Sequence, residues 1–244
     1  MKGYLSVVST GPGDEGNLTP RSREELQKAE VIAGYGTYLE QISSLLQGKE
    51  IISTGMRDEV GRCTEALRQA REGKRVCLIS GGDAGVYGLS GLMLELMTPE
   101  EQADLLVIPG VTSATACAAL LGAPLIHDFA VISLSNLLTE DSLIEKRLRM
   151  AADGDFVTVL YNPRSKKRHR LFSRTAEIFL EFREAGTPVG LVRNAYREEQ
   201  RVTLLRLDEL GECDWVDMRT TVVIGNSRTF ISGGRMITPR GYSL

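Results

Sequence analysis

Short apolar runs alternate with amphipathic stretches in the first half of the chain. Compact runs rich in β-branched residues, each bounded by turn residues, predict strands. They lie at 4–9, 31–33, 51–53, 75–80 and 105–108. Apolar or small residues at helical spacing predict helices at 20–28, 59–71, 89–97 and 113–121. Thr19 and Pro20 suit the N-cap and the first position of the first of these helices.

The alternation breaks at Gly122-Ala123-Pro124 and then resumes. Further strands are predicted at 130–134, 156–161, 188–192, 202–206 and 220–224, with helices at 140–152 and 168–184. Alternation of this kind is typical of helices that cover a mainly parallel sheet. We therefore expect an α/β protein with two α/β domains of similar size, 1–121 and 122–244, packed against each other.

The composition is that of a globular enzyme, because 42% of the residues are hydrophobic and 25% are charged. The net charge of −3 gives no reason to expect a nucleic-acid or membrane partner. No apolar run approaches the ~20 residues that cross a bilayer, and the N-terminus does not resemble a signal peptide. The 4 cysteines lie far apart without a C-x-x-C pair. We therefore expect free thiols, no bound metal and a cytoplasmic location.

Three glycine-rich or turn-rich loops follow predicted strands directly, at 11–14, 81–85 and 109–113. Ligands of open α/β sheets bind outside the carboxyl ends of the strands, so the loops are expected to converge on one crevice. The phosphate-loop pattern G-x-x-x-x-G-K-[ST] is absent from the sequence. Each loop could instead be an ordinary tight turn, but a turn does not require the acids Asp14 and Asp83.

A sulfonium methyl donor makes demands that such loops can meet. Methyl transfer mainly requires that two reactants be held in register, without a metal or phosphate site. The donor's hydroxyls, amine, carboxylate and adenine can be bound by small residues, backbone amides and a helix N-terminus. The segments 81–83 and 112–113 offer a surface of this kind.

Four segments carry a resemblance to a known family: Ser9–Asp14 with Leu18-Thr19, Ser80–Gly88, Pro109–Ser113 and Tyr161–Ser165. Together they resemble the tetrapyrrole (precorrin) methylases, and most nearly the precorrin-3B or cobalt-factor III C17-methyltransferases. The segments 34–38, 122–129, 189–200 and 238–242 support that branch. The resemblance covers essentially the whole chain.

The resemblance implies a two-domain methyltransferase of the tetrapyrrole methylase type, distinct from the Rossmann-type methyltransferases. It implies a homodimer that binds S-adenosylmethionine between its domains, releases S-adenosylhomocysteine, and methylates a corrin precursor at C17 with ring contraction in cobalamin biosynthesis. The N-terminal domain would hold the substrate trough and part of the cofactor site, which the C-terminal domain completes. Cofactor contacts carried over by motif are Pro12, Gly81, Gly82, Asp83, Val86, Thr112, Ser113, Asn162 and Ala195, with Tyr87, Tyr161 and Asn194 as flanking wall residues.

Two features depart from the family's pattern. Many members carry proline after the Gly-Gly-Asp of the second loop, where this chain has Ala84-Gly85. Some C17 enzymes also carry a cysteine-rich domain for an iron–sulfur cluster, and this sequence has no such cysteines. Any redox assistance is therefore expected to come from elsewhere.

Charged residues are the candidates for contacts with the substrate, because a precorrin carries acetate and propionate groups. The densest basic segment is 164–170, at the predicted start of a helix where cations are disfavoured. We expect Arg164, Lys166 and Lys167 to bind substrate carboxylates. A solvated basic face is the alternative.

Ring contraction requires proton movements, for which Asp14 and His127 are the acid–base candidates. Asp14 could equally cap its turn, and His127 could be a structural histidine between the domains. Tyr35 and Tyr38 could line the macrocycle pocket or belong to the core or its rim.

The sequence leaves other functions open. A methylase of the same family that acts at C20, C11 or C2 would share these motifs, because the shape of the trough decides the carbon. A ribosomal-RNA or protein methylase on the same scaffold would be expected to carry more basic charge. A non-catalytic nucleotide-binding regulator would transfer no methyl group, and the missing phosphate loop argues against it. Whether the substrate contains cobalt is also open.

Overall fold

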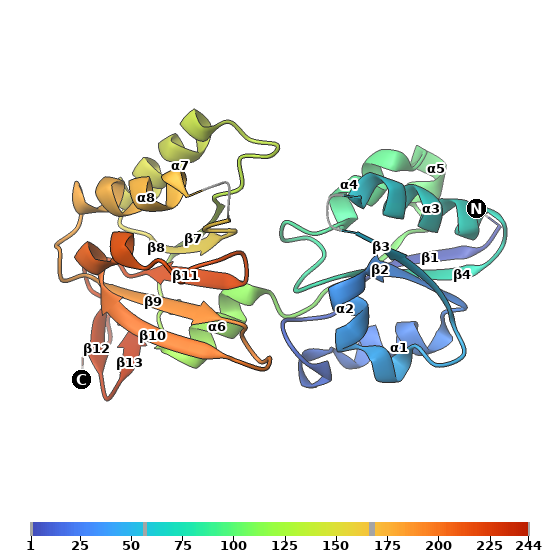
Figure 1. Ribbon diagram of the computed structural model, residues 1–244, viewed down its shortest axis with the longest axis horizontal. Coiled ribbons are helices and arrows are strands. Elements are labelled where there is room, and N and C mark those ends of the chain that lie inside the picture. Colours follow the sequence, from blue (N-terminus) through green and yellow to red (C-terminus); the bar gives the residue numbers. More distant parts are fainter. Residues whose placement is uncertain (1, 56–57, 166–168, 244) are drawn as a thin grey trace. The chain divides into compact units, whose positions relative to one another are not determined.

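The computed structural model describes residues 2–55, 58–165 and 169–243, which form two compact units, Met1–Ser113 and Ala114–Leu244 (Figure 1). The division falls at the start of helix α6 (Ser113–Leu121), whereas the glycine-proline break had suggested a boundary at its end. The buried residues Ala114 and Cys117 of α6 explain the difference, because they pack in the core of the second unit.

The first unit contains a fully parallel five-stranded sheet. Its strand order is β3-β2-β4-β1-β5. The strands are β1 (Tyr4–Ser9), β2 (Val31–Tyr35), β3 (Glu50–Thr54), β4 (Arg75–Ser80) and β5 (Leu106–Ile108). The connection from β1 to β2 runs toward the β3 edge of the sheet, and the connection from β4 to β5 runs toward the opposite edge. The carboxyl ends of β1 and β4 therefore form the switch point at which ligands bind in open α/β sheets.

Helices cover both faces of this sheet (Figure 1). One face packs against α3 (Glu59–Arg71) and α4 (Ser90–Leu96), and the other against α1 (Pro20–Lys28) and α2 (Gly36–Gln41). The short helix α5 (Pro99–Gln102) precedes β5. Successive residues of a strand point to opposite faces, so Val7 packs under α3 and α4 while Val8 packs over α1 and α2. Burial on both faces explains the almost continuous apolar runs.

The second unit contains a mixed sheet rather than the mainly parallel one that we expected. Its strand order is β10-β9-β11-β8-β7, and β7 and β8 are its only parallel pair of neighbours, since the other pairs are antiparallel. The strands are β7 (Phe129–Ser133), β8 (Val157–Tyr161), β9 (Pro188–Arg193), β10 (Arg201–Arg206) and β11 (Thr220–Ile224). The connection 194–200 is too short for a parallel crossover, which needs a dozen or more residues, so β9 and β10 form an antiparallel hairpin.

Three layers also build the second unit. Helices α7 (Asp141–Asp153) and α8 (Arg170–Leu180), with the 3-10 helix η3 (Leu207–Glu212), cover one face of the sheet. The other face carries α6 and the strand β13 (Arg235–Ile237), whose Met236 is fully buried there. β13 belongs to a small sheet with β6 (Gly122–Ala123) and β12 (Phe230–Ser232).

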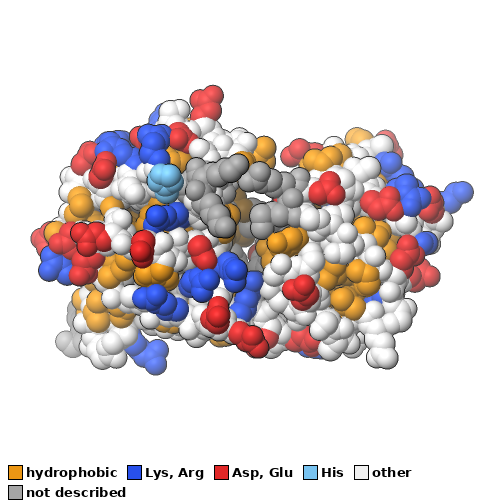
Figure 2. Space-filling model, viewed as in Figure 1, with side chains coloured by type: hydrophobic (Ala, Val, Ile, Leu, Met, Phe, Trp, Pro, Cys, Tyr) orange, Lys and Arg blue, Asp and Glu red, His pale blue; other side chains and the backbone are white. Residues whose placement is uncertain are grey.

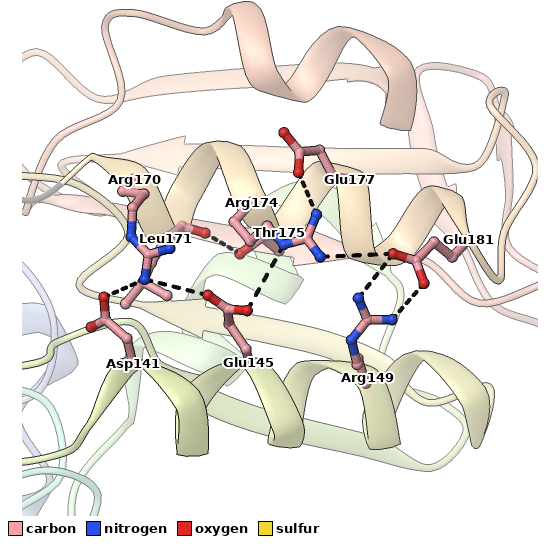
Figure 3. Close-up of polar contacts among 9 residues, drawn as sticks. All are labelled: Asp141, Glu145, Arg149, Arg170, Leu171, Arg174, Thr175, Glu177 and Glu181. Carbon is pink, nitrogen blue, oxygen red and sulfur yellow. Dashed lines mark hydrogen bonds and ion pairs between the residues drawn. The ribbon is translucent and has the colours of Figure 1, made fainter.

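A ladder of ion pairs joins α7 to α8 (Figure 3). Arg170 contacts Asp141 at 2.6 Å and Glu145 at 3.4 Å, and Arg149 contacts Glu181 at 2.5 Å. Pairs as exposed as these contribute about 0–1 kcal/mol each. Their contribution to the stability of the second unit is therefore expected to be small.

Acidic and basic side chains are intermixed over the face shown in Figure 2, in keeping with the net charge of −3. Among the helices of the described ranges, none combines the length and the apolar character of a bilayer-spanning helix. Within the same ranges, His, Cys, Asp and Glu side chains do not gather in groups of three that could hold a metal ion.

Candidate cofactor site

Three loops of the first unit meet at the carboxyl ends of β1, β4 and β5. Gly11, after β1, and Gly82, after β4, form a reciprocal backbone pair: the N–H of each donates to the carbonyl oxygen of the other at 3.0 Å. The third loop joins through Gly110, whose N–H donates to Oδ2 of Asp83 at 2.8 Å. The expected convergence of the three loops is therefore confirmed.

Two side chains fasten these loops together. Ser9 is fully buried, and its Oγ donates to the carbonyl oxygen of Ile108 at 2.6 Å and accepts from the N–H of Ala84 at 2.9 Å. The other oxygen of Asp83, Oδ1, accepts from the N–H of Gly85 at 2.8 Å. Both oxygens of Asp83 thus bind backbone amides. Ser9 was not predicted as a site residue from the sequence, although it begins the motif that contains Thr10 and Gly11.

The glycines at this junction are required by backbone conformation and by close approach. Gly11 and Gly82 have φ of 68° and 67°, which is left-handed backbone that favours glycine. A Cβ on Gly110 would lie 2.5 Å from Cβ of Ser9. A Cβ on Gly82, by contrast, would have as its nearest neighbour in the described part of the chain the nitrogen of Ser113, at 4.0 Å. A side chain at Gly82 is therefore disfavoured by the left-handed backbone and not by crowding from described residues.

The first loop has the letter spacing G-x-G-x-x-G, from Gly11 to Gly16. In a dinucleotide-binding fingerprint these glycines open a helix directly after the strand. Here Glu15–Asn17 forms one 3-10 turn, η1, and α1 begins only at Pro20. The spacing therefore lacks the structural context of that fingerprint.

The remaining predicted residues of the first unit lie on the same loops. Pro12 is buried, whereas Val86, Thr112 and Ser113 are half-buried. Tyr87 has a left-handed φ of 55° and a side chain that is 60% exposed. A bulky residue in this conformation is uncommon, and such strain concentrates at functional sites.

The predicted residues of the second unit lie at one edge of its sheet. Strands β7, β8 and β9 point in the same direction, and their carboxyl ends carry Ser133, Tyr161-Asn162 and Asn194. Asn162 Nδ2 donates to Oγ of Ser133 at 3.0 Å. The hydroxyl of Tyr161 accepts from the N–H of Ala114, at the start of α6, at 2.6 Å. Ala195 packs against the core beneath α6.

Asn194 has the features expected of a residue that binds a ligand. Its side chain is almost fully buried, with 5% of the residue exposed, and its Oδ1 accepts no hydrogen bond from any described residue. An unpaired buried acceptor costs about 1–3 kcal/mol. Its φ of 52° is also left-handed, and the backbone is held there by an N–H bond to the carbonyl oxygen of Arg219 at 3.1 Å. A ligand with an N–H donor, such as an amine or an adenine amino group, would satisfy this acceptor.

The two acid–base candidates lie in different settings. Asp14 is an exposed residue of the first loop, and its Oδ1 accepts from the N–H of Gly16 at 3.0 Å, which is the capping contact expected as its alternative role. His127 precedes β7, whereas the predicted cofactor residues of its unit follow β7, β8 and β9. The length of β7, at ~3.3 Å per residue, separates these edges by roughly 16 Å. His127 Nδ1 accepts from the N–H of Asp128 at 2.9 Å.

The predicted carboxylate-binding segment is described in part. Arg164 is half-buried, and its Nη1 donates to the carbonyl oxygen of Cys213 at 3.2 Å. Lys166 and Lys167 lie outside the described residues. Beside this segment is a pocket of about 210 Å³. Its lining is formed by Leu134, Asn136, Asp141, Pro163, His169, Arg170 and Leu171.

Curated relatives match nearly all of the chain. A cobalt-factor III methyltransferase of Priestia megaterium is 48% identical over 99% of this chain, which spans 46% of that relative's length. A probable cobalt-factor III C(17)-methyltransferase of Salmonella typhimurium is 44% identical over 98% of this chain and 100% of its own length. A precorrin-3B C(17)-methyltransferase of Sinorhizobium sp. is 37% identical over 100% of this chain and 98% of its own.

Solved structures share the fold. The methyltransferase CobJ superposes with a TM-score of 0.90 and 39% identity, over 97% of this chain and 100% of its own. A uroporphyrin-III C-methyltransferase of Thermus thermophilus, complexed with S-adenosylhomocysteine, superposes with a TM-score of 0.71 and 25% identity, over 91% and 92% of the two chains. The family model of the tetrapyrrole (corrin/porphyrin) methylases matches residues 4–211. This chain belongs to the tetrapyrrole (corrin/porphyrin) methylase family.

Proposed function

We propose that this chain is an S-adenosylmethionine-dependent methyltransferase that methylates C17 of cobalt-factor III or precorrin-3B, with contraction of the macrocycle, in cobalamin biosynthesis. The observation that carries the proposal is the 44% identity to the Salmonella typhimurium relative, which this chain matches over its whole length. Identity is 41–48% to the relatives named for cobalt-factor III and 37% to the one named for precorrin-3B, which favours the cobalt-containing substrate.

The family resemblance implies cofactor contacts on residues of each unit. S-adenosylmethionine, when bound, supplies a methyl group activated on a sulfonium sulfur. The task of the chain is then to hold the reactants in line, which can supply about 7–11 kcal/mol of the barrier reduction. We assign the backbone of Gly81–Asp83 and of Thr112-Ser113 to cofactor contacts, because the three loops converge there and Gly82 is not crowded by described residues. We assign the unpaired Oδ1 of Asn194 to one of the cofactor's amino groups.

Asp14 is the better-placed candidate for proton movements in ring contraction. It is exposed beside the loops assigned to the cofactor, whereas His127 lies at the opposite edge of its own sheet. Turnover is therefore expected to fall in Asp14→Asn and to persist in His127→Ala. Full turnover of Asp14→Asn would remove the acid–base role and leave the capping of η1.

Substrate carboxylates are assigned to Arg164, Lys166 and Lys167, on the grounds that this basic segment follows β8 at the edge that carries Asn162. Replacement of the three charges by glutamine is expected to weaken macrocycle binding and to leave the Kd for S-adenosylmethionine unchanged. The exposed pair Lys146 and Arg147 of α7 is the matched control, because its loss should change neither affinity.

The domain roles and a homodimer are expected from the family resemblance, and a cytoplasmic location from the sequence features given above. Size-exclusion chromatography with light scattering tests the dimer. The activity is tested by anaerobic incubation with S-adenosylmethionine and either cobalt-factor III or precorrin-3B, followed by mass and visible absorbance. A gain of one methyl group and the spectrum of a contracted ring support the proposal. If the protein methylates neither macrocycle but does methylate uroporphyrinogen III in a parallel incubation, it is a C2 methylase instead.

A further inference from the structure

The aromatic ring of Tyr38, in α2, covers the first residue of the loop that follows β4. A Cβ on Gly81 would lie 2.5 Å from Cζ and 2.6 Å from Cε1 of this ring. Gly81 does not have left-handed backbone. An alanine at this position is therefore excluded by the tyrosine ring and not by backbone conformation.

The ring of Tyr38 is itself braced from the side. Tyr35, the last residue of β2, meets it edge to face, with ring centroids 5.5 Å apart and an interplanar angle of 88°. The guanidinium carbon of Arg62, in α3, lies 6.0 Å from the centroid of the Tyr35 ring. Arg62 is 3% exposed and donates from Nε to Oγ1 of Thr54 at 2.8 Å and from Nη2 to the carbonyl oxygen of Gly55 at 2.9 Å.

This set of contacts runs along the carboxyl edge of the first sheet. Thr54 ends β3, Tyr35 ends β2 and Gly81 follows β4. The other side of the β4 loop is held by the backbone pair with the first loop and by the Asp83 bond to the third. Gly81 thus lies between an aromatic ring on one side and these hydrogen bonds on the other.

We propose that Tyr38, braced by Tyr35 and Arg62, is a positioning residue that fixes the Gly81–Asp83 loop in the conformation that receives the methyl donor. The inference rests on the proposed function, in which this loop contacts S-adenosylmethionine. Tyr38 acts through Gly81 and not on the reacting atoms. Arg62 acts one step further away, through Tyr35.

Two readouts test the inference. Hydrogen exchange of the amides of 81–85 in the ligand-free protein reports the loop directly, and titration calorimetry gives the Kd for S-adenosylmethionine. The variants are Tyr38→Ala, Tyr38→Phe, Gly81→Ala and the double variant of Tyr38→Ala with Gly81→Ala. The matched control is Tyr4→Ala, because Tyr4 lies under the guanidinium of Arg75 at 4.3 Å where β1 and β4 begin, at the other edge of the sheet.

Tyr38→Ala is expected to speed exchange across 81–85 and to raise the Kd about tenfold, which is the upper range for loss of an aromatic contact. Tyr38→Phe keeps the ring and should stay within about twofold of the parent, and Tyr4→Ala should lower Tm without changing the Kd. Gly81→Ala forces the ring or the loop to move and should also weaken binding. In the Tyr38→Ala background, Gly81→Ala should raise the Kd by about twofold or less, since the clash with the ring is gone.

The inference is overturned if Tyr38→Ala lowers Tm as Tyr4→Ala does but leaves both exchange and Kd unchanged. Additive effects of Tyr38→Ala and Gly81→Ala on Kd would also overturn it. If Tyr38→Ala does not fold, Gly81→Ala takes its place in the test. Unchanged amide exchange and an unchanged Kd in Gly81→Ala would then overturn the inference. If the parent protein does not bind S-adenosylmethionine, the proposed function fails, and the exchange measurement still decides whether Tyr38 positions the loop.

Discussion

Replacement of Asn194 by glycine should have opposite effects on folding and on cofactor binding. The change removes an acceptor, Oδ1, that is buried without a partner among the described residues, and glycine accepts the φ of 52° at this position. The backbone N–H bond to Arg219 is retained. A residue that served only the fold would show a loss of stability on truncation.

The magnitudes follow from the contacts. An unpaired buried acceptor destabilises the fold by about 1–3 kcal/mol, so its removal should raise the free energy of unfolding by part of that amount. Glycine costs about 0.5–1 kcal/mol in unfolded-chain entropy, and relief of left-handed strain returns about 1 kcal/mol. The free energy of unfolding should therefore stay the same or rise. A lost hydrogen bond of about 0.5–1.5 kcal/mol in the complex corresponds to a Kd for S-adenosylmethionine that is about 3- to 10-fold higher.

Urea denaturation of the ligand-free protein and titration calorimetry measure the two effects. Glu199→Gly is the matched control, because Glu199 also has a left-handed φ, of 57°, while its side chain is 78% exposed. It should leave the Kd unchanged. An Asn194→Gly variant that unfolds more easily and binds S-adenosylmethionine like the parent would refute the reasoning, since the amide would then serve the fold.

Three further changes test the packing of each unit. Asp83→Asn replaces an oxygen that accepts a backbone N–H by an NH2 group, so the free energy of unfolding in urea should fall by about 1–3 kcal/mol and cofactor binding should weaken. Asp155→Gly leaves the guanidinium of Arg183, whose side chain is 4% exposed, without its carboxylate partner at 3.1 Å. Because Asp155 is partly exposed, we expect a loss of about 1–3 kcal/mol with an unchanged Kd. Burial raises the pKa of the Glu25 carboxyl, but hydrogen bonds from Lys28 and Arg75 lower it by more. The pKa of Glu25 therefore lies below its ordinary value. The carboxylate should therefore stabilise the parent over Glu25→Gln above its unfolded pKa of about 4.3, and thermal scans should show this difference shrinking as pH falls through the lower folded pKa.

Each of these expectations can fail in a distinct way. An Asp83→Asn variant with parental stability would show that its carboxylate does not fasten the loops. A parental urea midpoint for Asp155→Gly would show that Arg183 tolerates burial without its partner. A stability difference between Glu25→Gln and the parent that persists unchanged at acid pH would contradict the role assigned to the Glu25 charge.

Much of the fold was predictable because strong periodic patterns are local. The predicted ranges 4–9, 75–80, 113–121 and 220–224 coincide with β1, β4, α6 and β11. The hairpin of β12 and β13 was missed, since all three residues of β12 are exposed and show no apolar alternation. The short helix α2 was not predicted as an element either, because its six residues are too few for a periodic signal.

Strand direction in the second unit depends on connection length, which hydrophobic periodicity does not report. The connection 194–200 excluded a parallel crossover between β9 and β10. The boundary between the units depends on which core receives α6, and this is decided by long-range packing of Ala114 and Cys117 rather than by the glycine-proline break.

The candidate site was predictable where backbone conformation demands glycine. Gly11, Gly82 and Gly110 stand out in the sequence because a tight turn or a close approach needs them. The roles of Ser9 and Tyr38 arise from strand register and from helix packing, which bring them to residues far along the chain. Both residues lie in segments that carry the family resemblance, but their contacts could not be predicted from those segments alone.

The central claim is most directly tested by transfer of a ¹³C-methyl group from labelled S-adenosylmethionine to cobalt-factor III, under anaerobic conditions, with the product examined by NMR. We predict one new ¹³C-methyl resonance at C17 of a contracted macrocycle, and none with the protein omitted. A label at another ring carbon would contradict the C17 assignment while retaining the methylase activity. No transfer by a folded protein to cobalt-factor III, or to precorrin-3B in the same assay, would contradict the account itself.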